Sequence, residues 1–380
     1  MSKIIVLGAG MIGSAMAIDL AKNHQVTLTD ISLQQLKKVK DKCPAVTISE
    51  LDVTDKTNLQ SALKPFDIVI SSVPSSLGYA TLKSIIESGK DVVDITFSSQ
   101  NSMDLDELAK EKRVTAIIDC GVAPGFDNLL LGYYNEKLKL TDFECLVGGL
   151  PKQKKWPFYY KAPFAPKDVI EEYTRPARYV ENSNLITREA LSEPEFVEFD
   201  NVGTLESFNT DGLRSIIFTM PHIKNMKEKT LRYPSHIEYI RVLKESGFFS
   251  NSKIEVDGAE ISPHDFTCKI LFNEWKLGDS EEEITVMRIS LKGDNAEGIS
   301  EEVVCDLYDE YSTETQTSSM ARTTGYTATA AANLVLAGLF TEKGVFPPEL
   351  IGKNENCFSF IFNYLKERNI NYIITTDAKT

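Results

Sequence analysis

Three glycines near the start of the chain have the spacing of a phosphate-binding turn. Gly8, Gly10 and Gly13 follow the β-branched run 4–7 and precede a helix-forming segment. In such a turn the first glycine permits the tight bend, the second lets a pyrophosphate approach the backbone, and the third lets the helix pack on the strand. The helix N-terminus then offers N–H donors and a partial positive charge to the phosphates. The pattern predicts a dinucleotide site that also includes Met11 and Ile12.

An acidic residue at the end of the next apolar run strengthens this prediction. Asp30 follows Gly13 by 17 residues, close to the spacing of a carboxylate that binds a ribose diol. A carboxylate there repels a 2′-phosphate, so we expect NAD more than NADP, with Ile31 as the next residue of the site. Two later loops are expected to flank the adenine and the nicotinamide ribose, although each also fits an ordinary turn after a strand: Asp52 and Val53, and Ser72, Val73 and Pro74.

An alternating fold is needed to bring these residues to one edge. Over the first 120 residues, short β-branched runs alternate with segments rich in helix formers, the pattern of βαβ units around a parallel sheet. We therefore expect an α/β, doubly wound N-terminal half. Strands are expected at 4–7, 26–28, 68–70, 92–95 and 114–118, and helices at 14–23, 32–42, 56–63, 79–88 and 105–112. The breaker cluster 121–125 ends this half and should loop over the carboxyl edge of the sheet.

Two aspartates close strands of the same expected sheet. Asp94 lies at the end of the expected strand 92–95, and Asp119 follows the expected strand 114–118. Because the carboxyl ends of parallel strands face the ligand in such folds, either acid could receive a proton or bind an ammonium group. The alternative is that both are helix caps or loop acids without a role in chemistry.

Charge and cysteine content disfavour several classes of function. The 380 residues include 41 basic and 55 acidic side chains, and the formal charge of −14 argues against nucleic acid or an anionic membrane as a partner. The apolar stretch 4–21 is interrupted by its glycines and by Asp19, so we expect a soluble, cytoplasmic protein. Six widely spaced cysteines, with no CxxC pair and no histidine at metal-ligand spacing, predict reduced thiols and no metal site.

The texture of the sequence changes at about residue 142. Prolines gather between 151 and 176, and strand-like runs at 143–147, 283–291 and 303–308 stand further apart, which favours an α+β second domain. The stretch 318–339, rich in Ala and Thr, predicts a buried helix, and 358–368 predicts a terminal one. We expect a nucleotide-binding domain at 1–125, an α+β domain at 126–320, and C-terminal helices at 321–380 that pack back on the first domain.

Several longer sequence blocks point to one family. They are GAGMIG at 8–13, GVAPGFDN at 121–128, VGGLP at 147–151, YYK at 159–161, EEYTRPAR at 171–178, DGLR at 211–214, KTLRYPSH at 229–236, and SSM and TGYT within 318–327. In these blocks the chain resembles the saccharopine dehydrogenase family, and within it the lysine 6-dehydrogenase branch. The resemblance implies a Rossmann domain followed by an α+β substrate and dimerisation domain. It also implies a homodimer or homotetramer that oxidises a C–N bond beside the nicotinamide.

One departure from the family pattern bears on the substrate. Saccharopine reductases of the family typically read Leu-Asp-Pro-Gly where this chain has Val-Ala-Pro-Gly at 122–125, so Ala123 replaces the acid that would face their substrate. This favours L-lysine, oxidised at its ε-carbon. A saccharopine dehydrogenase or reductase remains the alternative in chemistry, and a non-catalytic NAD(H)-binding regulator is the alternative of another class.

Amine oxidation sets requirements for the remaining site residues. Hydride transfer needs the nitrogen lone pair, and a lysine ε-amine with a reference pKa of about 10.4 is protonated at pH 7. Lys161, which follows two tyrosines in a proline-rich segment, is a candidate proton acceptor beside Asp94 and Asp119. An arginine fork suits the substrate carboxylate, and a polar cluster suits the rest of the substrate. The candidates, each of which also fits a structural role, are Arg232, Arg214, Asn209, Asp211 and Thr230.

Overall fold

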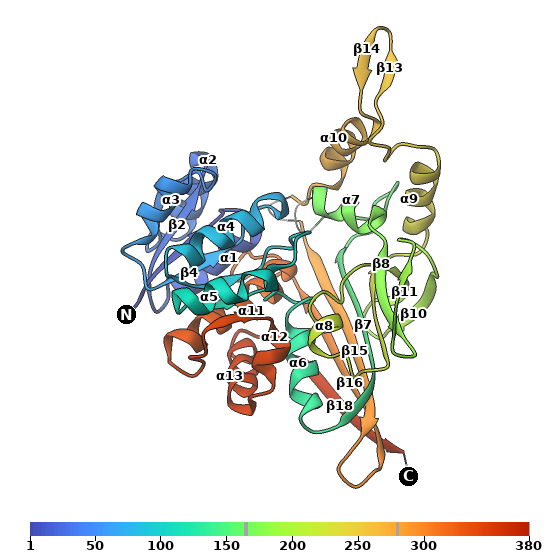
Figure 1. Ribbon diagram of the computed structural model, residues 1–380. Coiled ribbons are helices and arrows are strands. Elements are labelled where there is room, and N and C mark those ends of the chain that lie inside the picture. Colours follow the sequence, from blue (N-terminus) through green and yellow to red (C-terminus); the bar gives the residue numbers. More distant parts are fainter. Residues whose placement is uncertain (163–165, 279–280, 380) are drawn as a thin grey trace. The chain divides into compact units, whose positions relative to one another are not determined.

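The computed structural model describes residues 1–162, 166–278 and 281–379, and the chain divides into two compact units. Unit 1 comprises Met1–Lys139 and Met320–Asn371, and unit 2 comprises Leu140–Ser319 and Tyr372–Thr380. Figure 1 labels their helices and strands.

Unit 1 is built on a seven-stranded sheet in the spatial order β17-β6-β5-β4-β1-β2-β3. All of its strand pairs are parallel. The chain runs from β1 outward to β3 and then returns to β4 on the other side of β1, so the strand order reverses between β1 and β4, where such folds bind ligands. The strands are β1 Lys3–Leu7, β2 Gln25–Asp30, β3 Thr47–Glu50, β4 Ile68–Ser71, β5 Asp91–Asp94, β6 Thr115–Ile117 and β17 Gly344–Phe346.

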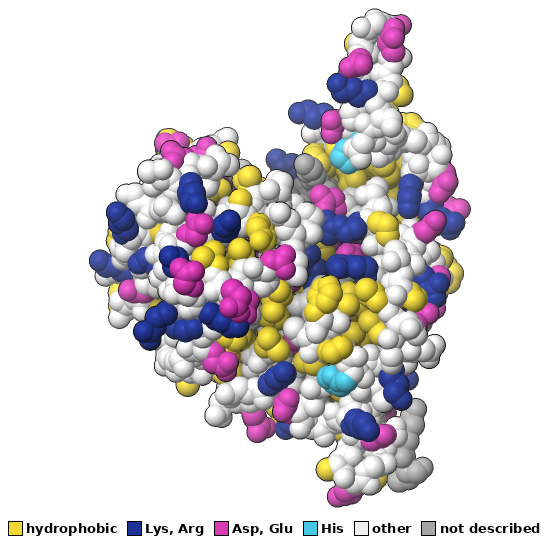
Figure 2. All heavy atoms as spheres, in the orientation of Figure 1, with side chains coloured by type: hydrophobic (Ala, Val, Ile, Leu, Met, Phe, Trp, Pro, Cys, Tyr) yellow, Lys and Arg dark blue, Asp and Glu magenta, His cyan; other side chains and the backbone are white. Residues whose placement is uncertain are grey.

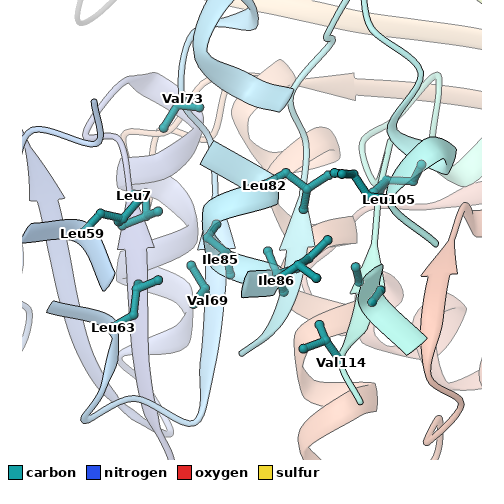
Figure 3. Close-up of a cluster of buried hydrophobic side chains, with 14 of the residues drawn as sticks. Leu7, Leu59, Leu63, Val69, Val73, Leu82, Ile85, Ile86, Leu105 and Val114 are labelled. Atoms are coloured by element: carbon teal, nitrogen blue, oxygen red, sulfur yellow. The ribbon is translucent and has the colours of Figure 1, made fainter. Parts of the chain in front are cut away.

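The helices between these strands pack their apolar stripes on the sheet. They are α1 Met11–Leu20, α2 Leu33–Lys42, α3 Lys56–Leu63, α4 Ser75–Glu87, the 3₁₀ turn η1 Ser102–Leu105, α5 Asp106–Lys112 and α6 Phe126–Asn135. Figure 3 shows one side of the core, where Leu59 and Leu63 of α3 and Ile85 of α4 lie near Leu7 and Val69 of the strands. These five side chains are at most 1% exposed, so this packing fixes how the helices sit on the sheet.

A segment distant in sequence completes unit 1. It contains α11 Ser319–Leu336, β17, α12 Pro348–Gly352 and α13 Glu355–Lys366. β17 pairs with β6 and forms one edge of the parallel sheet. The helices expected at 318–339 and 358–368 are therefore present as α11 and α13, and they belong to the unit that carries the glycine motif.

Unit 2 is a nine-stranded mixed sheet with helices. Its main path is β10-β11-β12-β7-β15-β16-β18, while β8 pairs with β12 and β9. The strands are β7 Lys139–Pro151, β8 Ala177–Glu181, β9 Asn184–Arg188, β10 Glu195–Phe199, β11 Gly203–Asn209, β12 Asn225–Arg232, β15 Glu283–Asp294, β16 Ser300–Glu310 and β18 Tyr372–Lys379. The helices are α7 Pro166–Thr174, α8 Ile216–Thr219, α9 His236–Glu245 and α10 Pro263–Trp275. A separate hairpin, β13 Ile254–Val256 and β14 Ala259–Ile261, projects beyond α10 (Figure 1).

The α/β class with a parallel nucleotide-binding half and a mixed second half agrees with the sequence prediction, but the limits of the parts differ. The predicted boundary at residue 125 falls before α6, which belongs to unit 1, and the units divide after Lys139. The expected block of C-terminal helices at 321–380 also differs at its end, because Tyr372–Lys379 forms β18 and pairs with β16 in unit 2. The β-branched run Ile373, Ile374, Thr375 and Thr376 favours this strand.

The six cysteines are free thiols, five of them buried. Within the described ranges, no group of three or more His, Cys, Asp or Glu side chains is placed to hold a metal ion. Each helix that the structure describes is too short or too polar to span a bilayer. Figure 2 shows basic and acidic side chains interspersed over the visible face.

Candidate functional site

Gly8 and Gly13 form the close crossing of β1 and α1. Gly8 has a φ of +100°, and a Cβ there would lie 2.5 Å from the carbonyl oxygen of Ser72. A Cβ on Gly13 would lie 2.0 Å from the carbonyl oxygen of Gly8 and 2.5 Å from Ser72 Oγ. These distances leave no room for a side chain, so the turn and the strand–helix packing both require glycine.

Gly10 differs, because the space beside it is open. Among the residues that the structure describes, no heavy atom would lie within 4 Å of a Cβ on Gly10, and its φ of −69° is open to any residue. Gly10 is the N-cap of α1, and no side chain caps this helix. The first N–H groups of a helix have no acceptor within the helix, so those of Met11 and Ile12 suit an anion beside Gly10. The geometry fits a pyrophosphate.

Asp30 lies at the end of β2, where the sequence predicts it, and its carboxylate touches the glycine turn. Oδ2 accepts the N–H of Ala9 at 2.7 Å, and Oδ1 accepts the N–H of Ser32 at 2.8 Å. The side chain is half-buried, and Ile31 beside it is 73% exposed. A fixed negative charge with an apolar neighbour lies next to the phosphate cradle, which suits a ribose diol better than a phosphate.

The adenine-flanking candidates lie in the loop after β3. Asp52 is exposed, and its Oδ1 accepts both the N–H of Thr54 at 2.9 Å and the Thr54 hydroxyl at 2.6 Å. The Thr54 hydroxyl and backbone together lower the pKa of Asp52. Val53 packs against the core cluster of unit 1. Both residues therefore have contacts of their own, and an adenine contact remains a prediction.

The loop after β4 touches the glycine turn through Ser72. The Ser72 hydroxyl donates to the carbonyl of Gly8 at 3.4 Å, and its backbone N–H donates to Leu7 at 2.9 Å. Val73 is 7% exposed and belongs to the core, while Pro74 is exposed and precedes α4. Of the three expected nicotinamide neighbours, Ser72 contacts the cradle, and a ligand contact of the other two remains a prediction.

Asp94 closes β5 with a buried carboxyl group. It is 2% exposed, and the Thr96 hydroxyl donates to its Oδ1 at 2.7 Å. Burial, with a smaller contribution from the charge of Asp119, raises the pKa of Asp94 to about 7, against the lowering effect of the Thr96 hydrogen bond. A carboxyl group that titrates near neutrality is suited to taking up and releasing a proton.

Asp119 and the loop after it lie beside Asp94. The N–H of Cys120 donates to the backbone carbonyl of Asp94 at 3.2 Å, and Asp119 is 7% exposed with a φ of +50°. Burial, together with the charges of Asp119 and Asp94, raises the pKa of the Cys120 thiol. The thiol therefore stays neutral, and the charge of Asp119 acts on both Cys120 and Asp94.

The breaker cluster forms a tight loop at this edge. The N–H of Gly121 donates to the carbonyl of Pro124 at 3.0 Å, and the N–H of Phe126 donates back to the carbonyl of Gly121 at 3.1 Å. Gly125 has a φ of +149°, and a Cβ there would lie 1.9 Å from the Gly121 carbonyl oxygen. Ala123 lies in this loop and places no acid there.

Lys161 belongs to unit 2 and has a structural contact. Its ammonium donates to the carbonyl oxygen of Glu274 at 2.5 Å. Glu274 is in the last turn of α10, where a cation satisfies a free carbonyl and opposes the negative end of the helix dipole. The contact favours a helix cap over the expected proton acceptor.

Arg232 is buried among partners of its own unit. It is 2% exposed, and its Nη2 donates to Glu172 Oε2 at 2.9 Å, its Nη1 to the Leu231 carbonyl at 2.9 Å, and its Nε to Tyr173 Oη at 3.2 Å. The guanidinium lies 4.4 Å from the ring centroid of Tyr160. An arginine held in this way favours a structural role over the expected carboxylate anchor.

His236 extends the same cluster. Its Nε2 lies 2.9 Å from Tyr173 Oη, and its Nδ1 lies 2.8 Å from the Phe158 carbonyl oxygen. Burial and the charge of Arg232 lower the pKa of His236 to about 3, so the ring is neutral. Nδ1 must then donate to Phe158, and Nε2 accepts from Tyr173.

The remaining substrate candidates form bonds inside unit 2. Asn209 Oδ1 accepts from Tyr179 Oη at 3.1 Å, and both oxygens of Asp211 accept from the Arg178 guanidinium at 2.9 and 3.0 Å. The hydroxyls of Thr230 and Thr210 lie 3.0 Å apart. Arg214 is 9% exposed with a φ of +51°. The side chains of the expected polar cluster therefore bond mainly to other residues of unit 2, and their contact with a substrate remains a prediction.

The candidates fall into two sets. The glycine turn, Asp30, the two cofactor loops, Asp94 and Asp119 belong to unit 1. Lys161, Asn209, Asp211, Arg214, Thr230 and Arg232 belong to unit 2.

Two family profiles match the chain. The saccharopine dehydrogenase NADP binding domain matches residues 4–117, and the saccharopine dehydrogenase C-terminal domain matches residues 121–370. The chain belongs to the saccharopine dehydrogenase family.

The chain spans about three fifths of the length of the curated relatives that it matches. The saccharopine dehydrogenase [NADP(+), L-glutamate-forming] of Pyricularia oryzae is 26% identical over 265 residues, which are 66% of this chain and 58% of the relative. The Saccharomyces cerevisiae protein of the same name is 24% identical over 67% of this chain and 60% of its own length. A solved apo structure of the Saccharomyces cerevisiae saccharopine dehydrogenase (L-Glu forming) superposes on this chain over the full length of both, with a TM-score of 0.80 and 21% identity. This likeness establishes the fold.

The family's domain limits differ from the compact units. The profile of the C-terminal domain spans 121–370 and so includes α6, α11, α12 and α13, all of which fold with unit 1. In this member of the saccharopine dehydrogenase family, the nucleotide-binding unit is discontinuous in sequence.

Sequence reasoning missed three side chains that hold the candidates in place. Thr96 binds Asp94, Glu172 pairs with Arg232, and Asp19 is buried in α1. For Asp19 the signal is visible in the sequence, because a lone charge in an otherwise apolar helix needs a buried partner.

Proposed function

We propose that this protein is an NAD(P)-dependent oxidoreductase that acts on the C–N bond of an amino acid in lysine metabolism. The observation that carries the proposal is the open cradle at Gly10, between two glycines that tolerate no side chain, on a chain of the saccharopine dehydrogenase family. The names of the relatives, which are saccharopine dehydrogenases and an alpha-aminoadipic semialdehyde synthase, support the same chemistry.

Unit 1 would hold the dinucleotide with its own groups. The N–H groups of Met11 and Ile12 would bind the pyrophosphate beside Gly10, and the Asp30 carboxylate would accept from a ribose hydroxyl. Ser72 would stand at the nicotinamide end of the cradle. A bound nicotinamide supplies the hydride acceptor or donor, whereas the chain supplies position and proton transfer.

Asp94 is the proposed proton acceptor. The amine nitrogen must be neutral when hydride leaves its carbon, so one group must take the ammonium proton first. Asp94 is buried beside Asp119 at the carboxyl edge of the sheet and has a pKa of about 7. A carboxyl group in this state releases its proton near neutral pH at little cost. Lys161 carries this role less well, because its ammonium is bonded to the end of α10.

Two substrates have an observation in their favour. Ala123 stands where saccharopine reductases of the family typically carry an acid, which favours L-lysine as substrate of a lysine 6-dehydrogenase. The names of the relatives favour saccharopine. Both substrates require the same oxidation of a carbon bonded to nitrogen, so the choice changes the anchors for the distal part of the substrate and leaves the role of unit 1 unchanged.

The dinucleotide is proposed to be NAD. Asp30 presents a negative charge beside the cradle, and the exposed neighbour Ile31 offers no cation for a 2′-phosphate. The relatives are named for NADP(+), so this preference would distinguish the chain from them.

The test is a matrix of two substrates and two dinucleotides. L-lysine and saccharopine are each offered with NAD and NADP, and the absorbance of the reduced nicotinamide is followed from about pH 6 to 10. Asp94→Asn is the diagnostic variant, and Lys161→Met is its control in unit 2. We expect turnover with NAD that Asp94→Asn lowers by about 10²–10⁴-fold and Lys161→Met leaves near the parent rate.

Each result has a defined consequence. Turnover of saccharopine alone would show that saccharopine is the substrate, as the names of the relatives suggest, and would exclude L-lysine. Binding of NADH without turnover of either substrate would favour the non-catalytic regulator. Light scattering on the same preparation checks the expected homodimer or homotetramer.

A further inference from the structure

Asp19 stands at an unfavourable place in α1. It lies in the last turn of the helix, where the macrodipole is negative, and it is 1% exposed. No basic residue of α1 lies in that turn to offset the charge. The local cation is Lys22, just after the helix, whose Nζ donates to Asp19 Oδ1 at 3.2 Å from a side chain that is 55% exposed. An exposed ion pair contributes little, so the buried carboxylate needs further partners from elsewhere in the fold.

The main partners come from the segment 320–371. Arg368 Nε donates to both carboxylate oxygens of Asp19 at 2.9 Å, Tyr364 Oη donates at 2.7 Å, and Thr329 Oγ1 donates at 2.9 Å. The Arg368 guanidinium lies 3.3 Å from the ring centroid of Tyr364. Burial opposes ionisation, but the charge and hydrogen bonds of Arg368, with help from Tyr364, hold the pKa of Asp19 below its ordinary value. The carboxylate is thus charged and held by three side chains of one distant segment.

The same segment follows α1 along its length. Ile12, Met16 and Asp19 are spaced by four and three residues and so share one face of α1. On α11, a Cβ on Gly325 would lie 3.0 Å from Met16 Cγ and 3.4 Å from Ile12 Cγ2, and Thr329, four residues on, binds Asp19. The face of α1 that packs on α11 therefore begins at Ile12, in the turn whose N–H groups border the open cradle.

We propose that Asp19 and Arg368 are positioning residues for the bound dinucleotide. The buried ion pair fixes the far end of α1, and the contact at Gly325 fixes its first turn, so the helix N–H groups keep their alignment with the phosphates. The C-terminal segment thereby sets the affinity of the cradle for the dinucleotide, although Asp19, Arg368 and Gly325 do not themselves border the cradle. The inference rests on the proposed dinucleotide binding and adds the residues that control it.

The experiment measures the Kd of NADH and NADPH by fluorescence titration, well below the unfolding temperature of every variant. Asp19→Asn removes the charge, Arg368→Lys keeps the cation but loses the Nε–H that binds both oxygens of Asp19, and Gly325→Ala crowds the first turn of α1. Asp106→Asn is the matched control, because Asp106 Oδ1 accepts the N–H of Val345 at 2.8 Å and so binds the same segment away from α1. Hydrogen exchange of α13 is followed with and without the dinucleotide.

For Asp19→Asn we expect a Kd raised about five-fold or more, the size of a typical coupling between two sites. Arg368→Lys and Gly325→Ala should show smaller increases, and Asp106→Asn should bind like the parent even where it unfolds at an equally lowered temperature. Because coupling is reciprocal, the dinucleotide should slow exchange in α13 of the parent and lose this effect in Asp19→Asn.

Unchanged Kd values in Asp19→Asn and Gly325→Ala would overturn the inference and leave the proposed function intact. An equal rise in Kd in Asp106→Asn would mean that the contacts of Asp19 act only through the overall stability of the fold, and this result would also overturn the inference. A parent chain that binds neither dinucleotide would remove the proposed function itself, so the two failures are distinct.

Discussion

Gly10→Ala and Gly13→Ala, three residues apart, should have opposite effects: the first should weaken dinucleotide binding at unchanged stability, and the second should destabilise the fold. A methyl group on Gly10 meets no heavy atom of residues 1–162, 166–278 and 281–379 within 4 Å, and the residue already has a φ of −69°. The loss of unfolded-state entropy stabilises Gly→Ala by about 0.4–1 kcal/mol, and the poorer N-cap costs a similar amount. The free energy of unfolding of Gly10→Ala should therefore stay within about 1 kcal/mol of the parent.

A methyl group on Gly13 has no such room. It would lie 2.0 Å from the Gly8 carbonyl oxygen and 2.5 Å from Ser72 Oγ, both well inside contact distance. The carbonyl belongs to the turn itself and cannot rotate away, so α1 must move off β1. Overpacking of this kind costs about 1–3 kcal/mol, which lowers Tm by several degrees in a domain of this size.

The two variants then separate fold from ligand. If a pyrophosphate occupies the space beside Gly10, the added methyl group should raise the Kd of NADH about ten-fold or more, equivalent to about 1.4 kcal/mol, at an unchanged Tm. Calorimetry gives the Tm values, and fluorescence titration gives the Kd. A Gly10→Ala variant that binds NADH like the parent would refute the placement of the phosphates, because no atom of the described part of the chain occupies that space.

Three further predictions concern charge. Asp30→Ser combined with Ile31→Arg should move kcat/KM toward NADP, because a cation replaces the anion beside the ribose; equal kcat/KM for NAD and NADP in the parent would contradict this. Asp94 has a pKa of about 7 in the fold and about 3.9 unfolded, so its contribution to stability is greatest below about pH 4 and is lost as the pH rises to 7. Asp94→Asn should therefore gain stability over the parent by up to about 4 kcal/mol across that range, as measured by urea unfolding, and a pH-independent difference would count against the raised pKa. Arg232→Ala should cost about 3–5 kcal/mol, since it leaves Glu172 without its buried partner. A loss of kcat/KM at unchanged stability would instead restore Arg232 as the carboxylate anchor.

The nucleotide half could be predicted because its signals are local. The glycine spacing, the acid 17 residues later and the alternation of strands and helices all lie within one continuous stretch of sequence. Each is fixed by backbone geometry that only certain residues satisfy, as Gly8 and Gly13 illustrate. The sequence does not predict two strands of the same sheet, β3 and β17. β4 and β6 are equally short but lie in longer apolar runs, whereas β3 has one apolar residue, in Thr-Ile-Ser-Glu, and β17 has two, in Gly-Val-Phe.

The candidates in unit 2 could not be resolved because their roles depend on distant partners. From the sequence, Asp211 is a candidate for contact with the substrate. In the structure, both of its carboxylate oxygens accept hydrogen bonds from Arg178, 33 residues earlier. Arg232 reads as an anchor until Glu172, 60 residues earlier, is found beside it. These pairings depend on which helices, strands and loops become neighbours in the fold, since Glu172 lies on α7 and Asp211 in the loop after β11. A single sequence does not specify those neighbours.

Asp19 and Asp30 show how the same residue type acquires two roles within one motif. Both acids lie near the glycine turn in sequence, and both are ionic or hydrogen-bonding partners of other segments. Asp30 ends a strand beside the glycine turn and is half-buried, where its carboxylate accepts the N–H of Ala9. Asp19 ends a helix against α11 and α13, where its charge is neutralised by Arg368. A unit limited to residues 1–125 would contain the whole glycine motif yet leave Asp19 buried without its main partner. The discontinuous unit therefore follows from the chemistry of α1: the helix that we propose to bind phosphate carries a buried acid whose main partner, Arg368, lies in the C-terminal segment.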